Sequence, residues 1–118
     1  SLRELVRISL RLSPERLVVG EVRDGEAADL LSAWNTGHDG GLCTIHASSA
    51  QKGLTRLEQL CLDGGKTSAK LLISEAVHLV FFMEKVGTKR LIQELISLDG
   101  LNPDQSYRVK TLWSRNNA

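Results

Sequence analysis

The stretch that decides the fold is residues 13–50, SPERLVVGEVRDGEAADLLSAWNTGHDGGLCTIHASSA. The short apolar run Leu17–Val19 does not alternate with polar residues, which predicts a strand covered on both faces of a parallel sheet. Asp24 is placed to cap a helix that closes at Asn35–Gly37. A second apolar segment, Leu42–Ile45, follows a polar loop. The order strand, helix, strand predicts an α/β fold with parallel strands and flanking helices.

Outside this stretch, three further segments have the apolar spacing of helices. The first is residues 2–12, which ends before Ser13-Pro14. The second begins with a cap at Ser48 or Ser49 and ends at residues 63–65. Its apolar face contains Leu54, Leu57 and Cys61. The third starts at about Thr67 and has the apolar positions Leu71, Leu72 and Ala76.

The pattern changes to strands towards the C-terminus. Leu79–Met83 is rich in β-forming residues and predicts a buried strand. Turn residues at Gly87 and at 102–104 separate it from two more strands, Arg90–Leu98 and Tyr107–Trp113. Alternation in the last one predicts one covered and one wetter face. We expect an antiparallel C-terminal edge on a single domain over residues 1–118, because no repeat or linker divides the chain.

Composition limits the classes of function. The chain has 118 residues and a formal net charge of +1, so no strong field favours nucleic acid or a membrane surface. No apolar run is long enough to span a bilayer, and the charged N-terminal segment is unlike a signal peptide, which predicts an intracellular protein. Cys43 and Cys61 have no metal or redox spacing and are expected to be buried free thiols in a reducing compartment.

Two polar residues, Glu21 and His46, follow the two predicted parallel strands. Ligands of open α/β sheets bind at the carboxyl ends of such strands. A carboxylate there can orient the water that attacks a γ-phosphate, and an imidazole beside it can contact the phosphate. Gly20 permits close backbone approach, and Arg23 can neutralise charge or pair with a carboxylate. On pattern alone, surface ion pairs or satisfied core groups are equally good readings of these residues.

Three other chemistries fit single features less well. His38, Cys43 and His46 have no fourth ligand for zinc, and binding would pull Cys43 out of a strand. A hydrolase dyad of Cys43 with either histidine conflicts with the apolar setting of a strand-interior thiol. The basic residues of the N-terminal segment could contact nucleic acid, but the aromatic content of 4% and the small net charge argue against a dedicated surface. We expect no metal site of the protein's own and no direct nucleic-acid binding.

The strings GEVR at 20–23, NTGH at 35–38 and TIHA at 44–47 occur together and in this order. This combination resembles the second nucleotide motif and the histidine box of the type II and type IV secretion ATPases. The string AWNTGHDGG is similar to the TrbB-like conjugal-transfer branch of that family. The resemblance extends weakly to about His78. It implies a partial RecA-like P-loop NTPase domain.

The resemblance also implies roles for single residues. Glu21 matches the family's catalytic glutamate, and His46 matches the histidine that faces the γ-phosphate. Gly20 stands where many other P-loop enzymes have a magnesium-binding aspartate. His38 and Thr44 lie in the same histidine box as His46. All of these belong to an implied site for ATP and Mg²⁺, which is incomplete in this chain.

The family's assembly is implied in the same way. Its members form hexameric rings that hydrolyse ATP at subunit interfaces, peripheral to the inner membrane on the cytoplasmic side, and act with other secretion components. Arg23 is then expected near a subunit boundary. The phosphate loop is expected upstream of residue 1, so this chain alone should not hydrolyse ATP. Residues 65–67, Gly-Lys-Thr, imitate the end of such a loop, but Leu60 stands where it requires glycine.

Because the phosphate loop of the family is not among these 118 residues, two interpretations are possible. The chain is the C-terminal part of an ATPase, or it is a truncated, non-catalytic copy that binds sister subunits or the secretion machinery. In either case, a sheet flank left without its neighbouring strand exposes unpaired backbone groups and apolar surface. We therefore predict that the isolated chain self-associates.

Overall fold

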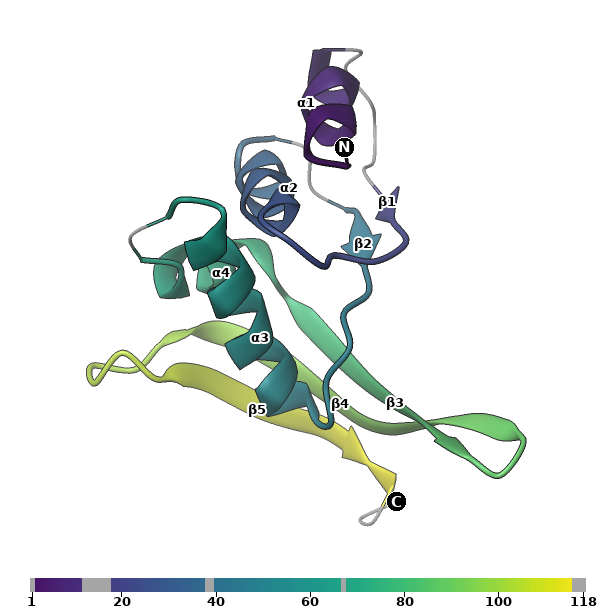
Figure 1. The fold of residues 1–118 in the computed structure, drawn as a ribbon. Helices are drawn as coiled ribbons and strands as arrows, with labels where there is room; N and C mark the ends of the chain where they lie inside the picture. The colour runs from purple at the N-terminus through teal and green to yellow at the C-terminus, as the bar shows by residue number, and fades with distance from the viewer. Residues whose placement is uncertain (1, 12–17, 38–39, 67, 116–118) are drawn as a thin grey trace.

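The computed structural model describes residues 2–11, 18–37, 40–66 and 68–115. These residues form four helices and five strands (Figure 1). Helices and strands alternate in the first part of the chain, and the last three strands follow one another at its C-terminal end. In chain order these elements are α1 (Leu2–Arg11), β1 (Val18–Val19), α2 (Glu26–Asn35), β2 (Leu42–Cys43), α3 (Ala50–Asp63), α4 (Lys70–Ala76), β3 (Leu79–Val86), β4 (Lys89–Leu101) and β5 (Tyr107–Ser114).

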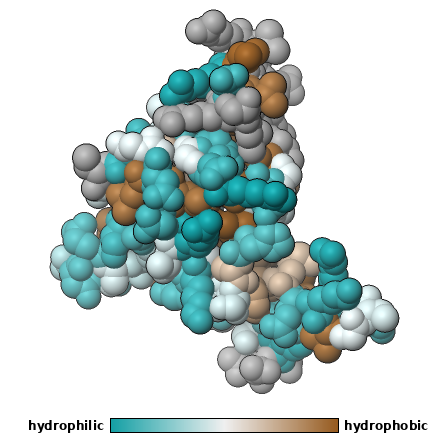
Figure 2. Space-filling view, in the orientation of Figure 1, coloured by the Kyte–Doolittle hydropathy of each residue, from teal (hydrophilic) through white to brown (hydrophobic). Residues whose placement is uncertain are grey.

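The helices enclose the main core. Their fully buried side chains include Leu30 and Leu31 of α2, Leu60 and Cys61 of α3, and Ile73 of α4. In α3 the buried residues recur every three or four positions, at 50, 53, 54, 57, 60 and 61, so this part of the core follows from amphipathic patterning. The outward side of α3 is hydrophilic (Figure 2). The predicted face of α3 and the predicted end of α2 are confirmed.

The predicted cap of α3 is confirmed, and the predicted apolar face of α4 is wrong at one position. Ser49 caps α3, because its side chain accepts a hydrogen bond from the backbone N–H of Lys52 at 3.1 Å. In α4 the prediction was wrong for Leu71, which is 60% exposed, whereas Ile73 and Ala76 are buried. The helix has only seven residues, and a rotation of one position decides which side chains face the core.

The strands β1 and β2 pair in parallel, with Val18 opposite Leu42 and Val19 opposite Cys43. The backbone N–H of Val22 donates to the carbonyl of Thr44 at 2.9 Å, which continues the association past the strand ends. The predicted strand, helix, strand order is therefore present, although β2 is shorter than the expected segment Leu42–Ile45. Leu17 lies outside the described residues.

The strands β3, β4 and β5 form a separate antiparallel sheet in that order. Gly87 turns the β3–β4 hairpin with φ at +62°, a conformation that favours glycine. The second turn is held by Asp104, whose carboxylate accepts a hydrogen bond from the backbone N–H of Ser106 at 3.0 Å. The predicted successive antiparallel strands and both turns are confirmed, but these strands form a sheet of their own and not an edge of the parallel one, as was predicted.

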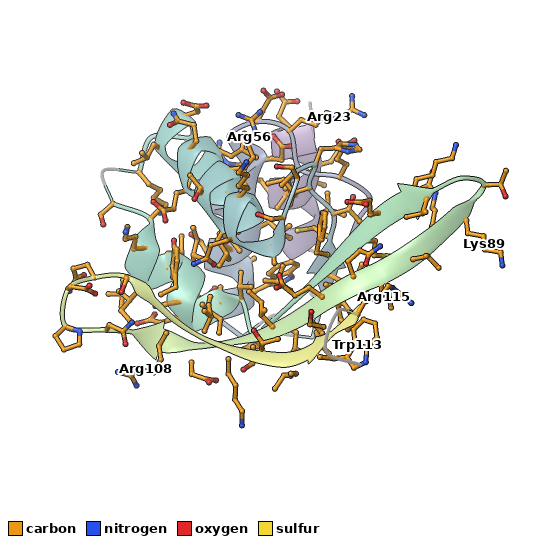
Figure 3. All side chains as sticks on the ribbon, turned by 90° about the horizontal axis from the view of Figure 1, so that it is seen from below. Arg23, Arg56, Lys89, Arg108, Trp113 and Arg115 are labelled. Carbon is orange, nitrogen blue, oxygen red and sulfur yellow. The ribbon has the colours of Figure 1, made fainter. Side chains whose placement is uncertain are left out.

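The prediction that Leu79–Met83 is a buried strand was wrong. Leu79, Phe81 and Met83 are 51%, 55% and 55% exposed. The helices cover one face of the β3–β4–β5 sheet and leave the other face open (Figure 3). Alternate residues of β3 therefore point away from the core, and only Val80 and Phe82 pack against it.

The predicted alternation of β5 was also wrong over most of its length. Val109 and Trp113 alternate in phase with Tyr107 but are 38% and 36% exposed, and only Tyr107 near the start of the strand packs against the core. Register shifts between β4 and β5 interrupt the simple alternation. Within the described part of the chain, no helix is long and apolar enough to cross a membrane.

Candidate functional site

The carboxyl ends of β1 and β2 bring Glu21 and His46 together. Nε2 of His46 lies 3.0 Å from Oε1 of Glu21, within hydrogen-bond distance. The two residues are far apart in sequence and meet because their strands run side by side in the same direction. Glu21 is mostly covered, with a side chain 20% exposed, whereas that of His46 is 92% exposed. The pair therefore presents an accessible imidazole above a sheltered carboxylate.

Arg23 completes the cluster from the other side of the carboxylate. Its Nε donates to Oε2 of Glu21 at 2.7 Å, and its second guanidinium nitrogen lies 2.6 Å from the same oxygen. The hydrogen bond to Glu21, and then the charge of Glu21, raise the pKa of Arg23 above its ordinary value. Glu21 thus contacts the guanidinium of Arg23 through one oxygen and the imidazole of His46 through the other. These two contacts hold the carboxylate in one orientation.

The other predicted site residues contribute less directly. The hydroxyl of Thr44 donates to the carbonyl of Gly20, which ties the end of one strand to the end of the other. A Cβ at Gly20 would meet no atom within 4 Å, so within the described residues glycine is not required there by packing. His38 lies outside the described residues.

Asp24 does not cap α2, contrary to the sequence prediction. The N-cap residue is Gly25, which makes no side-chain cap hydrogen bond. The side chain of the next residue, Glu26, reaches back instead, and its Oε1 accepts hydrogen bonds from the backbone N–H groups of Arg23 at 2.8 Å and Asp24 at 3.2 Å. The sequence signal for this contact is an acidic residue in the first turn of the helix.

The structure also bears on the rejected chemistries. Burial raises the pKa of the Cys43 thiol to about 11, so this thiol stays protonated near neutral pH and is a poor nucleophile. Gly64 and Gly65 follow the end of α3, and Gly65 has φ at +97°. The Gly-Lys part of the false phosphate loop therefore terminates a helix, whereas a phosphate cradle opens one. Thr67 lies outside the described residues.

Comparison with known proteins places this chain in a family. The family model described as Type II/IV secretion system protein matches residues 1–108. The chain belongs to this family of type II/IV secretion system proteins. The resemblance inferred from the three sequence strings is thereby confirmed, including its TrbB-like character, because the relatives include conjugal transfer proteins of that name.

Individual members of the family agree over most of the chain. The conjugal transfer protein TrbB of Rhizobium radiobacter is 46% identical over 96 residues, which cover 81% of this chain and 30% of TrbB. The type IV secretion system protein PtlH of Bordetella pertussis is 34% identical over 107 residues, covering 83% of this chain and 32% of PtlH. The chain therefore spans about a third of the length of these curated relatives.

A solved structure supports the fold. The crystal structure of the VirB11 ATPase from the type IV secretion system of Brucella suis, in complex with sulphate, superposes with a TM-score of 0.74 at 29% identity. The match covers 80% of this chain and 31% of that protein. The mixed α/β fold with its three-stranded antiparallel sheet is thus similar to part of a type IV secretion ATPase.

Proposed function

We propose that this chain is the C-terminal part of a RecA-like domain in a secretion ATPase that couples ATP hydrolysis to conjugal transfer or type IV secretion. The observation that carries the proposal is the position of Glu21 at the end of a parallel strand, with Arg23 and His46 on its two oxygens. The family membership supports it. By analogy with its relatives, the whole protein would act as a hexamer at the cytoplasmic face of the inner membrane, with other secretion components.

The geometry suggests a distinct role for each side chain. Glu21 is sheltered and fixed, which suits a carboxylate that accepts a hydrogen bond from the attacking water and aligns it. His46 and Arg23 are exposed donors beside it, suited to contact phosphate oxygens as negative charge develops there. His38, Gly20 and Thr44 would form the rest of the nucleotide-binding surface.

The donor set fits the anionic part of a nucleotide. Two of the three grouped side chains, Arg23 and His46, are donors towards anions, and the hydroxyl of Thr44 lies at the same strand ends. Bound ATP would supply the phosphoanhydride that is cleaved, and Mg²⁺ would neutralise its phosphates. Glu21 is the only carboxylate of this cluster, so the remaining oxygen ligands of Mg²⁺ would come from phosphate, water or other segments.

Magnesium-dependent ATP turnover tests the proposal. The 118-residue chain is compared with a longer protein that carries it together with an upstream phosphate loop, and with the Glu21→Gln variant of that protein. We expect turnover only in the longer protein, and a loss of at least about a hundredfold in the variant. Glu75→Gln is the matched control, because Glu75 is an exposed carboxylate on α4 that contacts Asn35. Equal turnover in the Glu21→Gln variant would refute the proposed role.

A second candidate function is a non-catalytic interaction module that binds sister subunits. The observation that favours it is the open face of the β3–β4–β5 sheet (Figure 3). Phe81 pairs with Leu95, and Leu95 pairs with Trp113, so these three apolar side chains form one row across that face. They line a groove of about 430 Å³ to which Arg90 and Arg115 also contribute.

The two candidate functions differ in what they require of the longer protein. An interaction module would bind its sister subunits with the same affinity when Glu21 is changed to Gln, and the assembled complex would show no turnover above background. An ATPase would lose turnover with that change and keep its assembly. Measuring both properties on the same preparations separates the two.

A further inference from the structure

Glu26 is a buried carboxylate to which the proposed mechanism gives no role. It is the first residue of α2 and only 5% exposed, whereas the other carboxylates that the structure describes are exposed or partly exposed. An ionised carboxylate is costly to bury unless donors compensate its charge. Here one oxygen accepts two backbone hydrogen bonds, and the side chain also sits at the positive end of a helix.

The two donors belong to the segment that carries the candidate catalytic groups. They are the backbone N–H groups of Arg23 and Asp24, at 2.8 Å and 3.2 Å from Oε1 of Glu26. Arg23 is the residue whose guanidinium contacts Glu21, and Glu21 lies two positions earlier on the same strand end. The carboxylate of Glu26 therefore fixes the backbone from which Arg23 projects towards Glu21.

The same segment is held from a second direction by the end of α3. A Cβ placed on Gly64 would lie 2.6 Å from the carbonyl oxygen and 3.0 Å from the Cα of Gly25. These are backbone atoms, so the contact cannot be relieved by rotating a side chain. Glycine at position 64 lets the two segments touch.

We propose that Glu26 is a positioning residue, which holds the segment from Glu21 to Asp24 so that Glu21, Arg23 and His46 keep their mutual geometry. Gly64 supports the same segment by packing against Gly25. The role in hydrolysis rests on the proposed ATPase function, but the structural part of the inference does not. Glu26 touches neither the phosphate nor the water in this scheme and acts only through the backbone of Arg23 and Asp24.

Amide hydrogen exchange in the 118-residue chain tests the structural part without nucleotide. In Glu26→Ala, exchange at the amides of Arg23 and Asp24 should accelerate by at least about tenfold, because each loses a hydrogen bond to a charged acceptor. Glu26→Gln keeps an acceptor oxygen and should restore much of the protection. Amides within α3 should be unchanged, and Glu75→Ala is the control. Uniform acceleration over the whole chain, or none at Arg23 and Asp24, would overturn the proposal.

Steady-state kinetics in the longer, active protein test the consequence for hydrolysis. Glu26→Ala should lower kcat by about tenfold or more with little change of KM for ATP, because Glu21 acts in the chemical step. Glu26→Gln should recover most of that loss. Gly64→Ala is a second route to the same disturbance if Glu26→Ala does not fold, and should change the same two amides.

The two levels of failure can be told apart. If the unchanged longer protein has no turnover, the ATPase proposal fails, while the exchange result still supports or refutes the hold of Glu26 on Arg23 and Asp24. If exchange responds as expected but kcat per folded molecule is unchanged, with the folded fraction measured on the same preparation, Glu26 is a structural residue and its positioning role is refuted.

Discussion

Replacing Tyr107 with phenylalanine should destabilise the protein through the loss of one hydrogen bond. The hydroxyl of Tyr107 donates to Oε1 of Glu58 at 2.5 Å, and this bond joins β5 to α3 across 49 positions of sequence. Phenylalanine keeps the ring, so its packing against the core is retained. Burial, followed by the hydrogen bond to Glu58, raises the pKa of Tyr107 well above its ordinary value, which agrees with a hydroxyl held in its neutral, donating form.

The size of the effect follows from the chemistry of the pair. A hydrogen bond to a charged group contributes about 1.5–3 kcal/mol. Tyr107 and Glu58 are both partly exposed, so water can replace part of the lost contact, and we expect a value near the lower end of that range. The cation–π contact of Lys70, at 5.6 Å from the ring centre, is available to phenylalanine as well and should not contribute to the difference.

A double-mutant cycle isolates this interaction. Urea unfolding is followed for the unchanged chain, Tyr107→Phe, Glu58→Ala and the double variant, and the coupling free energy is calculated from the four values. We expect a coupling of about 1 kcal/mol or more, because both single variants lose the same charged hydrogen bond. A coupling below about 0.3 kcal/mol, within the usual scatter of additive sites, would refute the reasoning.

Three further predictions concern other parts of the fold. Burial raises the pKa of Cys61 from 9.0 to about 11, so the stability due to its neutral thiol is complete below pH 9 and is lost between pH 9 and 11. Urea unfolding across that range should show a falling free energy of unfolding, and Cys61→Ala should make this fall smaller. Ser49→Ala removes the cap of α3 and should cost about 1 kcal/mol in the same assay, whereas no loss would refute the cap. Phe81→Lys on the open sheet face should convert a self-associating chain to monomer in sedimentation velocity, and an unchanged distribution would place the contact elsewhere.

Much of the local structure was predictable because its causes are local. The cap at Ser49, the end of α2 at Asn35 and the hairpin turn at Gly87 each depend on a few neighbouring residues. The closeness of Glu21 and His46 was also predictable, because parallel strands bring their carboxyl ends to one edge. Predicting this contact required only the correct order of strands and helix along the chain.

The errors arose where a distant element decides the outcome. Leu79 and Phe81 have the composition of a buried strand, but burial depends on whether a helix covers each face, and here one face is open. The cap of α2 was assigned to Asp24 by sequence position, whereas the geometry of the chain entering the helix brings the side chain of Glu26 back to the backbone N–H groups of Arg23 and Asp24. Asp24 and Glu26 lie only two positions apart at the start of the helix, so position along the chain does not decide between them.

By itself, then, the sequence determined the order and type of the elements, the turns between them and the two residues that meet at the strand ends. Periodicity and turn chemistry are properties of short segments, and these fix such features. Only the tertiary structure decided that Arg23 and His46 occupy different oxygens of Glu21, that Glu26 is buried behind them and that Gly64 packs on Gly25. Those arrangements depend on how separate segments pack in three dimensions, which residue spacing along the chain does not encode.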